Sequence, residues 1–183
     1  MSNSRTKKVD LKQLIYIAIF TALVIVVQYI PIKIGTFELA LSVPIIVIGA
    51  ALCGPLCGAW LGIVFGAVVL ALPGTAAYLS FNLFGTIVTV LLKGTLAGFA
   101  AGLVYRALAG VNKYLGCLAS AVAATLVNTS VFLIGSLLFF ESDIATVIGV
   151  LISLNFIIEL IVNIVLVPTI YRIIEVGEKR FRI

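Results

Sequence analysis

The sequence contains no histidine and very little charge. Of its 183 residues, 10% are Asp, Glu, Lys or Arg, whereas 63% are hydrophobic. Soluble domains carry about 25% charged residues, so a soluble chain of this size could not cover so much apolar surface. Only Cys53, Cys57 and Cys117 could supply thiols, and their spacing is neither a redox CxxC nor a zinc pattern. We therefore expect a membrane protein without a metal site.

Long apolar runs take the place of the missing charge. Stretches such as TALVIVVQYI and GVLISLNFIIELIVNIVLV do not alternate between polar and apolar residues. This pattern argues against a membrane β-barrel and favours helical spans of about 20 residues. We predict an all-α membrane protein with one domain over residues 1–183. Its six transmembrane helices are expected at approximately 12–30, 39–53, 55–72, 79–107, 115–140 and 145–174.

The distribution of Lys and Arg predicts the orientation. Cytoplasmic loops of membrane proteins are enriched in these residues. If both termini are cytoplasmic, only Lys33 falls in an outer loop and only Lys93 within a span, and every other cation is cytoplasmic. The outer loops then hold Glu38, Glu141 and Asp143. The net charge of +5 is thus a topology signal, and nucleic-acid binding is disfavoured.

Glycine recurs every four residues in two predicted spans. One series runs from Gly54 to Gly66, and the other runs from Gly94 to Gly102. Small residues at this spacing allow helix backbones to approach closely in lipid. We interpret both series as packing surfaces inside the bundle. Pro55, directly after Gly54, suits the first turn of a helix, because its missing N–H has no helical partner there.

Lys93 and Glu159 are the only charged residues deep inside the predicted spans. A charge near the bilayer centre costs about 3 kcal/mol or more, so it faces a bundle interior or a polar cavity. At 1.5 Å per residue, both side chains lie roughly 20 Å from the outer ends of their predicted helices. This shared depth permits an ion pair.

Amides and hydroxyls accompany the two charges. Thr86 and Thr89 fall on the helical stripe of Lys93, and Asn163 falls on that of Glu159. One interpretation is a structural salt bridge with polar side chains joining the helices. We favour a pocket for a small solute that enters from outside, because a buried ion pair adds little net stability. The candidate substrate-binding residues are Asn82, Lys93, Asn128, Asn155 and Glu159. Phe37, Tyr78 and Phe81 are positioned to cover the mouth.

Motifs for common enzyme chemistry are missing. The sequence has no GxxxxGK[ST] loop, no HExxH helix and no GxSxG turn. We therefore expect neither an enzyme nor a bound cofactor.

Four segments of the chain carry recognisable motifs, and a basic N-terminus precedes an apolar first helix. The motifs are Ala18-xxx-Ala22, Cys53-Gly54-Pro55-Leu56-Cys57-Gly58-Ala59, Ala124-Thr125-Leu126-Val127-Asn128-Thr129 and Asn155-Phe156-Ile157-Ile158-Glu159. With these features the chain resembles, over nearly its whole length, the substrate-binding S components of energy-coupling factor (ECF) vitamin transporters of prokaryotes. Within the family, Asn128-Thr129 and the Asn155/Glu159 pair look most like pantothenate-type members.

The resemblance implies a six-helix S-component bundle in the prokaryotic plasma membrane that binds a vitamin near the outer surface. It also implies that residues 31–41 help to close the pocket. Ala18 and Ala22 would contact a transmembrane coupling subunit, and two cytoplasmic ATPases would drive uptake; from their spacing alone, internal packing is equally open. Lys93 would suit the carboxylate of pantothenate, a flavin carbonyl or a folate. The alternative is a self-sufficient secondary carrier or channel for a small polar solute.

Overall fold

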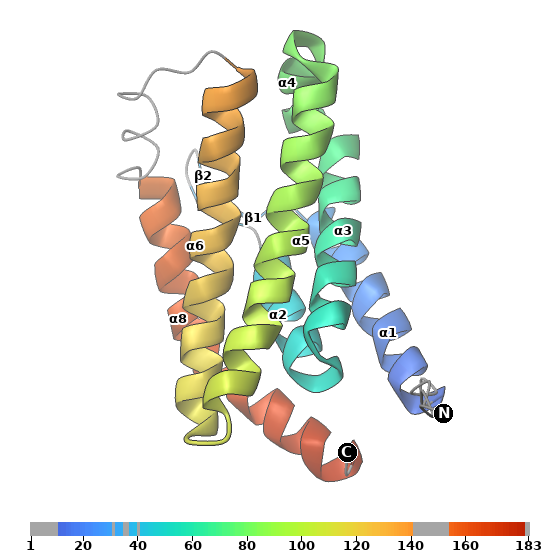
Figure 1. Cartoon of the computed structure of the whole chain (residues 1–183), viewed down its shortest axis with the longest axis vertical. Coiled ribbons are helices and arrows are strands. Elements are labelled where there is room, and N and C mark those ends of the chain that lie inside the picture. The colour runs from blue at the N-terminus through green and yellow to red at the C-terminus, as the bar shows by residue number, and fades with distance from the viewer. Residues whose placement is uncertain (1–10, 31, 35–36, 40, 141–153, 182–183) are drawn as a thin grey trace, which may run out of the picture.

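The computed structural model describes residues 11–30, 32–34, 37–39, 41–140 and 154–181. The chain runs up and down through a helical bundle (Figure 1). The helices are α1 (Leu11–Gln28), α2 (Ser42–Cys53), α3 (Pro55–Ala71), α4 (Ala76–Phe81), α5 (Leu83–Leu108), α6 (Lys113–Phe139) and α8 (Leu154–Phe181). A 3-10 turn, Pro73–Thr75, precedes α4.

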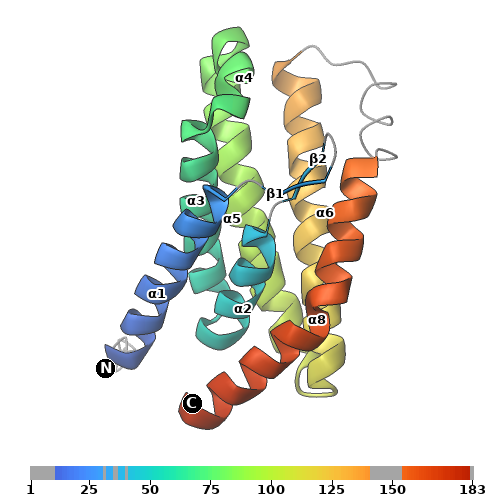
Figure 2. The same cartoon turned by 180° about the vertical axis from the view of Figure 1, so that it is seen from behind.

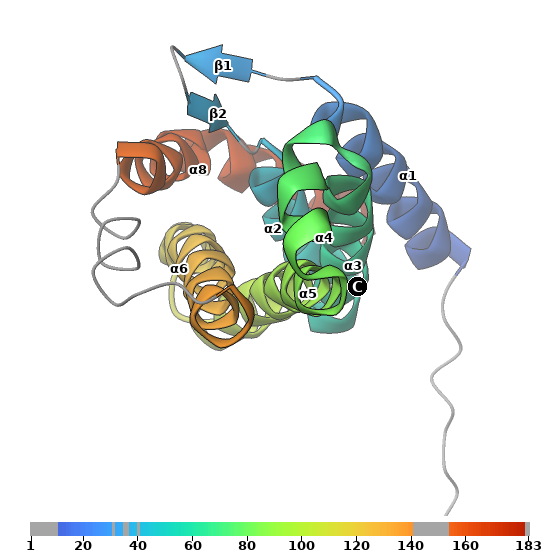
Figure 3. The same ribbon diagram turned by 90° about the horizontal axis from the view of Figure 1, so that it is seen from above.

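Strands β1 (Ile32–Ile34) and β2 (Phe37–Leu39) pair in antiparallel register between α1 and α2, in a segment predicted as a loop. Strand β2 lies beside α8. Figure 3 shows this hairpin at the flank of the bundle, next to α8 and α2.

The bundle is helical and apolar, as predicted. Within the described residues, α5, α6 and the Phe156–Gly177 part of α8 are long and apolar enough to cross a membrane. Helix α3 and the Pro73–Phe81 segment form a fourth candidate span if this bent pair is counted as one, and α1 and α2 are shorter apolar helices. The N-terminal end of α1 and the C-terminal end of α8 lie at one end of the bundle, and α4 lies at the other (Figures 1 and 2). We call these the termini end and the α4 end.

The fourth predicted span, 79–107, is divided in the structure. The chain bends by 78° between α3 and the Pro73–Phe81 segment, and a second break at Asn82 separates α4 from α5. Lys93 therefore lies only ten residues into α5, about 15 Å from its start. The estimate of 20 Å was wrong because it ignored Asn82 as a helix-starting residue.

The last predicted span also differs from the structure. Helix α8 continues to Phe181 instead of ending at 174. The range 145–153, Glu141 and Asp143 lie outside the described residues. Pro168 lies inside α8, where it removes one backbone donor, and Figure 2 shows the helix changing direction along its length.

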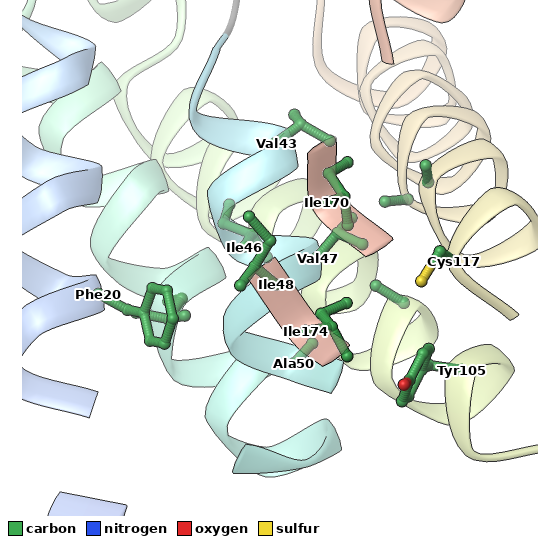
Figure 4. Close-up of a cluster of buried hydrophobic side chains, with 14 of the residues drawn as sticks. Phe20, Val43, Ile46, Val47, Ile48, Ala50, Tyr105, Cys117, Ile170 and Ile174 are labelled. Atoms are coloured by element: carbon green, nitrogen blue, oxygen red, sulfur yellow. The ribbon is translucent and has the colours of Figure 1, made fainter. Parts of the chain in front are cut away.

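The bend in α8 closes the termini end of the core. Helix α2 is short, and the C-terminal part of α8 passes beneath it. Ile170 and Ile174 are buried against this helix, near Val47 and Tyr105 (Figure 4). These residues belong to the main apolar cluster, which surrounds α2 and includes side chains of α1, α3, α5, α6 and α8.

Helices α3 and α5 touch through their backbones. A Cβ atom on Gly62 would overlap the carbonyl oxygen of Gly94, and one on Gly94 would overlap that of Gly62. Gly58 and Gly98 form the same reciprocal contact one turn away. The two glycine series therefore pair with each other inside the bundle, which confirms the packing interpretation. Between α2 and α3, Gly54 has a φ of +99°, a conformation that suits only glycine.

Helix α1 is attached along one side only. Its buried face, with Phe20 and Val24, packs against α2 and α3. The Trp60 indole N–H donates to Thr21 Oγ1 at 3.1 Å, which ties α3 to α1. Ala18 and Ala22 lie on the exposed side of the helix.

We predict that Gly62→Ala destabilises the protein. The added methyl group must push the Gly94 backbone away, and overpacking of this kind costs about 1–3 kcal/mol. The melting temperature of the detergent-purified protein should fall by several degrees. Gly110→Ala is the control, because nothing lies within 4 Å of a Cβ at that position. Equal melting temperatures for the two variants would contradict the backbone contact.

Candidate functional site

Two contacts fix the register of α5 against α6. Near the termini end, Ser120 Oγ donates to the carbonyl of Ala101 at 2.7 Å. Toward the α4 end, Gly135 leaves room for the side chain of Thr89. Lys93 follows Thr89 by one turn, and its ammonium therefore meets α6 between these two contacts.

The Lys93 ammonium lies between two aromatic rings. Its Nζ atom is 5.1 Å from the ring centroid of Phe132 on α6 and 6.0 Å from that of Phe65 on α3. Such contacts stabilise a cation by about 0.5–2 kcal/mol, more as water is removed. Phe65 reaches this position because Gly94 lets α3 approach α5, and the Phe65 ring packs against that glycine. Among the described residues, Lys93 has no hydrogen-bond acceptor.

A buried hydrogen bond fixes α8 against α6. Asn163 Nδ2 donates to Thr125 Oγ1 at 2.9 Å, and both side chains are fully buried. Glu159 lies one turn from Asn163 toward the α4 end, which brings it level with Asn128 and Thr129. The two helix registers thus bring Lys93, Asn128 and Glu159 to neighbouring levels of the bundle.

Lys93 and Glu159 attract each other electrostatically across the helices. In the part of the chain that the structure describes, no direct ion pair joins them. The pair is therefore close enough to interact but does not use up the hydrogen-bonding capacity of either group.

Three buried oxygen atoms in this region have no hydrogen-bond partner within the described chain: Thr89 Oγ1, Asn128 Oδ1 and Glu159 Oε1. Leaving a buried polar group unsatisfied costs about 1–3 kcal/mol, so native proteins contain few of them. Three such oxygen atoms, one each on α5, α6 and α8, therefore mark a region that is suited to hydrogen-bond donors from outside the chain.

The other two predicted substrate-binding residues are Asn82 and Asn155. Asn82 caps α5: its Oδ1 accepts from the Gly85 N–H at 2.8 Å, and its Nδ2 donates to the Phe139 carbonyl at 3.1 Å. Both of its polar groups are therefore engaged within the fold. Asn155 lies in the first turn of α8, but its side chain lies outside the described residues, as does that of Phe37.

Aromatic side chains of α4 cover the end of α6. The Tyr78 ring stands edge-on to Phe132 at 6.1 Å and to Phe140 at 5.5 Å, and Phe81 lies 6.2 Å from Phe140. Thr86 Oγ1 donates to the Tyr78 carbonyl at 2.8 Å and holds α4 against α5. Phe132 thus contacts both Lys93 and Tyr78 of α4.

Phe65 and Phe132 were missed by the sequence analysis. Both are phenylalanines in apolar spans that contain many such residues, and nothing in the spacing separates them from lipid-facing ones. The one signal in the sequence was the matching spacing of the two glycine series. If they had been paired as a single interface, Phe65 would have been placed near Lys93. For metals, the described residues hold no group of three or more Cys, Asp or Glu side chains that could bind an ion.

Comparison with known protein families identifies the family of the chain. Residues 12–171 match the model of the family described as ECF transporter, substrate-specific component. No curated protein sequence matches the chain.

We predict that Asn163→Leu and Thr125→Val each destabilise the protein, because each removes one partner of the buried α6–α8 hydrogen bond. The expected cost is about 0.5–1.5 kcal/mol, as for other interhelical hydrogen bonds in membranes. The double variant should cost clearly less than the sum, since both changes remove the same bond. Thermal unfolding in detergent measures all three. Strict additivity would show that the bond does not join the helices.

Proposed function

Because the chain belongs to the family of ECF transporter substrate-specific components, we propose that its polar site captures a vitamin or related micronutrient for uptake. Members of the family are the membrane-embedded substrate-binding subunits of ECF transporters and are not enzymes. The proposal concerns which residues bind the substrate, what the substrate is and how the chain meets its partners.

One observation carries the proposed site. Lys93, Asn128 and Glu159 come from three helices to neighbouring levels, and the acceptor atoms of Asn128 and Glu159 lack partners within the described chain. A structural role would favour full pairing of such groups, because unpaired polar atoms in an apolar bundle are costly. A substrate role explains why they are available. Asn155, one turn before Glu159 on α8, completes the proposed set.

Pantothenate is our best candidate for the substrate. Its carboxylate suits the Lys93 ammonium, and its amide and hydroxyl groups can donate to Asn128 and Glu159. Asn82 contributes by holding α5 to the end of α6, through its bonds to Gly85 and Phe139. The resemblance of Asn128-Thr129 and Asn155/Glu159 to pantothenate-type members supports the same choice.

The proposed topology has six spans, with the termini end in the cytoplasm of a prokaryotic cell. The exposed cations Arg106, Arg172 and Lys179 belong to the halves of α5 and α8 nearest that end, in agreement with the enrichment of cations in cytoplasmic segments. The substrate site is then nearer to the α4 end and receives its ligand from outside.

The proposed partners are a transmembrane coupling subunit and two cytoplasmic ATPases. Ala18 and Ala22 support this assignment because they lie exposed on α1, away from its contacts with α2 and α3. Two alanines four residues apart form a shallow surface against which another membrane helix can pack closely.

We predict that Lys93→Met lowers the affinity for pantothenate by about 10- to 100-fold, the range expected for losing a hydrogen bond to a charged group. The bundle should stay folded, because methionine keeps the apolar stem and removes a charge that is costly in the membrane. Isothermal titration of the detergent-purified protein measures the affinity. Lys179→Met is the control, since this lysine is exposed and pairs with Glu175 at 3.0 Å. Equal affinities in both variants would refute a ligand role for Lys93.

We also predict that Ala18→Trp and Ala22→Trp prevent copurification with the coupling subunit and ATPases, because the indole ring keeps the partner helix away. Substrate binding by the isolated chain should be unaffected. Ser130→Trp is the matched control, because Ser130 is an exposed small residue on α6, and Figure 3 shows α6 on the side of the bundle away from α1. Normal assembly of the α1 variants, or uptake by the purified chain alone in liposomes, would contradict this assignment.

A further inference from the structure

The polar site contains two opposite charges that form no direct ion pair within the described residues. Lys93 and Glu159 attract each other, yet the described residues include no direct ion pair between them. Instead, the ammonium faces the rings of Phe65 and Phe132. An aromatic face attracts a cation but accepts no strong hydrogen bond, so the ammonium's three N–H donors stay available.

Oxygen atoms without hydrogen-bond partners in the described chain lie on α5 itself and on α6 and α8. Asn128 is about nine-tenths buried and Thr89 is 2% exposed, and an oxygen of each lacks a partner, as does Glu159 Oε1. The Asn128 oxygen can only accept hydrogen bonds, as can the Glu159 carboxylate in its ionised form, whereas the Thr89 hydroxyl can accept or donate. The site therefore offers one strong donor group on α5 and acceptor oxygens on α6 and α8.

A ligand with only one kind of group cannot satisfy this arrangement. A cation would meet the Lys93 ammonium in a medium of low dielectric constant, where repulsion is strong. An acid without donors would pair with Lys93 but leave Asn128 Oδ1 and Glu159 Oε1 unsatisfied. A neutral molecule with donors could offer the ammonium only a neutral acceptor such as a carbonyl oxygen, whose hydrogen bond is weaker than that of an anionic oxygen.

We propose that the site selects ligands that combine an anionic oxygen group, bound by Lys93, with hydroxyl or N–H donors that reach Asn128 and Glu159. This inference rests on the proposed function and narrows its substrate class. Discrimination of this kind is strong where a buried site is built for hydrogen bonds, because a ligand that lacks one leaves the protein group unpaired.

Two matched ligand pairs test the two halves of the proposal on the full-length protein in nanodiscs. Pantothenate and pantothenol share their donors, but only pantothenate has a carboxylate. Biotin and lipoate share a carboxylate on a pentanoyl chain, but only biotin has N–H donors. Thiamine serves as the cationic probe, and affinities are measured by isothermal titration.

We expect pantothenate or biotin to bind at least about 10-fold more tightly than its matched partner, and thiamine not to bind, given the strength of hydrogen bonds to charged groups. Tightest binding of thiamine, lipoate or pantothenol would overturn the proposal and leave the micronutrient-binding function standing. Failure of all five probes to bind would count against the micronutrient-binding function itself.

Asn128→Leu separates ligand binding from folding. Because Asn128 Oδ1 has no partner within the described chain, leucine should leave the melting temperature unchanged or raise it. The affinity for the preferred probe should nevertheless fall by about 10-fold or more. Asn163→Leu is the contrasting variant, since that asparagine is bonded to Thr125 and its replacement lowers stability. Unchanged affinity in Asn128→Leu would overturn the donor half of the proposal.

Discussion

The reciprocal backbone contact between α3 and α5 is the constraint on which the rest of the structure depends. In an apolar solvent no hydrophobic effect presses helices together, so close packing must supply the attraction. Gly62 and Gly94 bring the two helices near enough for dispersion contacts along their backbones. The same closeness carries Phe65 to the ammonium of Lys93. A bulkier residue at either glycine would separate the helices and remove one aromatic wall of the site.

The close packing of α3 against α5 offsets the loss of stability caused by the polar site. A charge and several unpaired oxygens inside a membrane bundle lower stability, and a direct Lys93–Glu159 ion pair would recover part of that loss. It would also occupy both groups. The aromatic rings of Phe65 and Phe132 stabilise the Lys93 ammonium without neutralising its charge or accepting strong hydrogen bonds from it. Stability is thus supplied by the glycine interface and by the apolar cluster around α2, while three oxygens of the proposed site lack partners within the described chain.

Much of this arrangement could be predicted from the spacing of residues along the helices. The rest depends on contacts between residues that are far apart in the sequence. The glycine spacing indicated close packing, and the helical stripes placed Lys93 and Glu159 on inward faces. The sequence could not show which helix each glycine faces, because this depends on tertiary contacts. The capping role of Asn82 was not foreseen, since a polar residue on a helical stripe and one capping a helix look alike until the helix boundary is known. The substrate-binding roles themselves remain predictions.

The position of α1 separates the two proposed activities in space. This helix packs against α2 and α3, whereas Lys93 faces α6 and α8 from the other side of the α3–α5 pair. Its exposed side holds Ala18 and Ala22 and contributes nothing to the polar site. Substitutions at distant sites without shared partners are usually additive. We therefore expect changes on the exposed face of α1 to affect the proposed assembly, and changes at Lys93 to affect the proposed substrate binding, independently of each other.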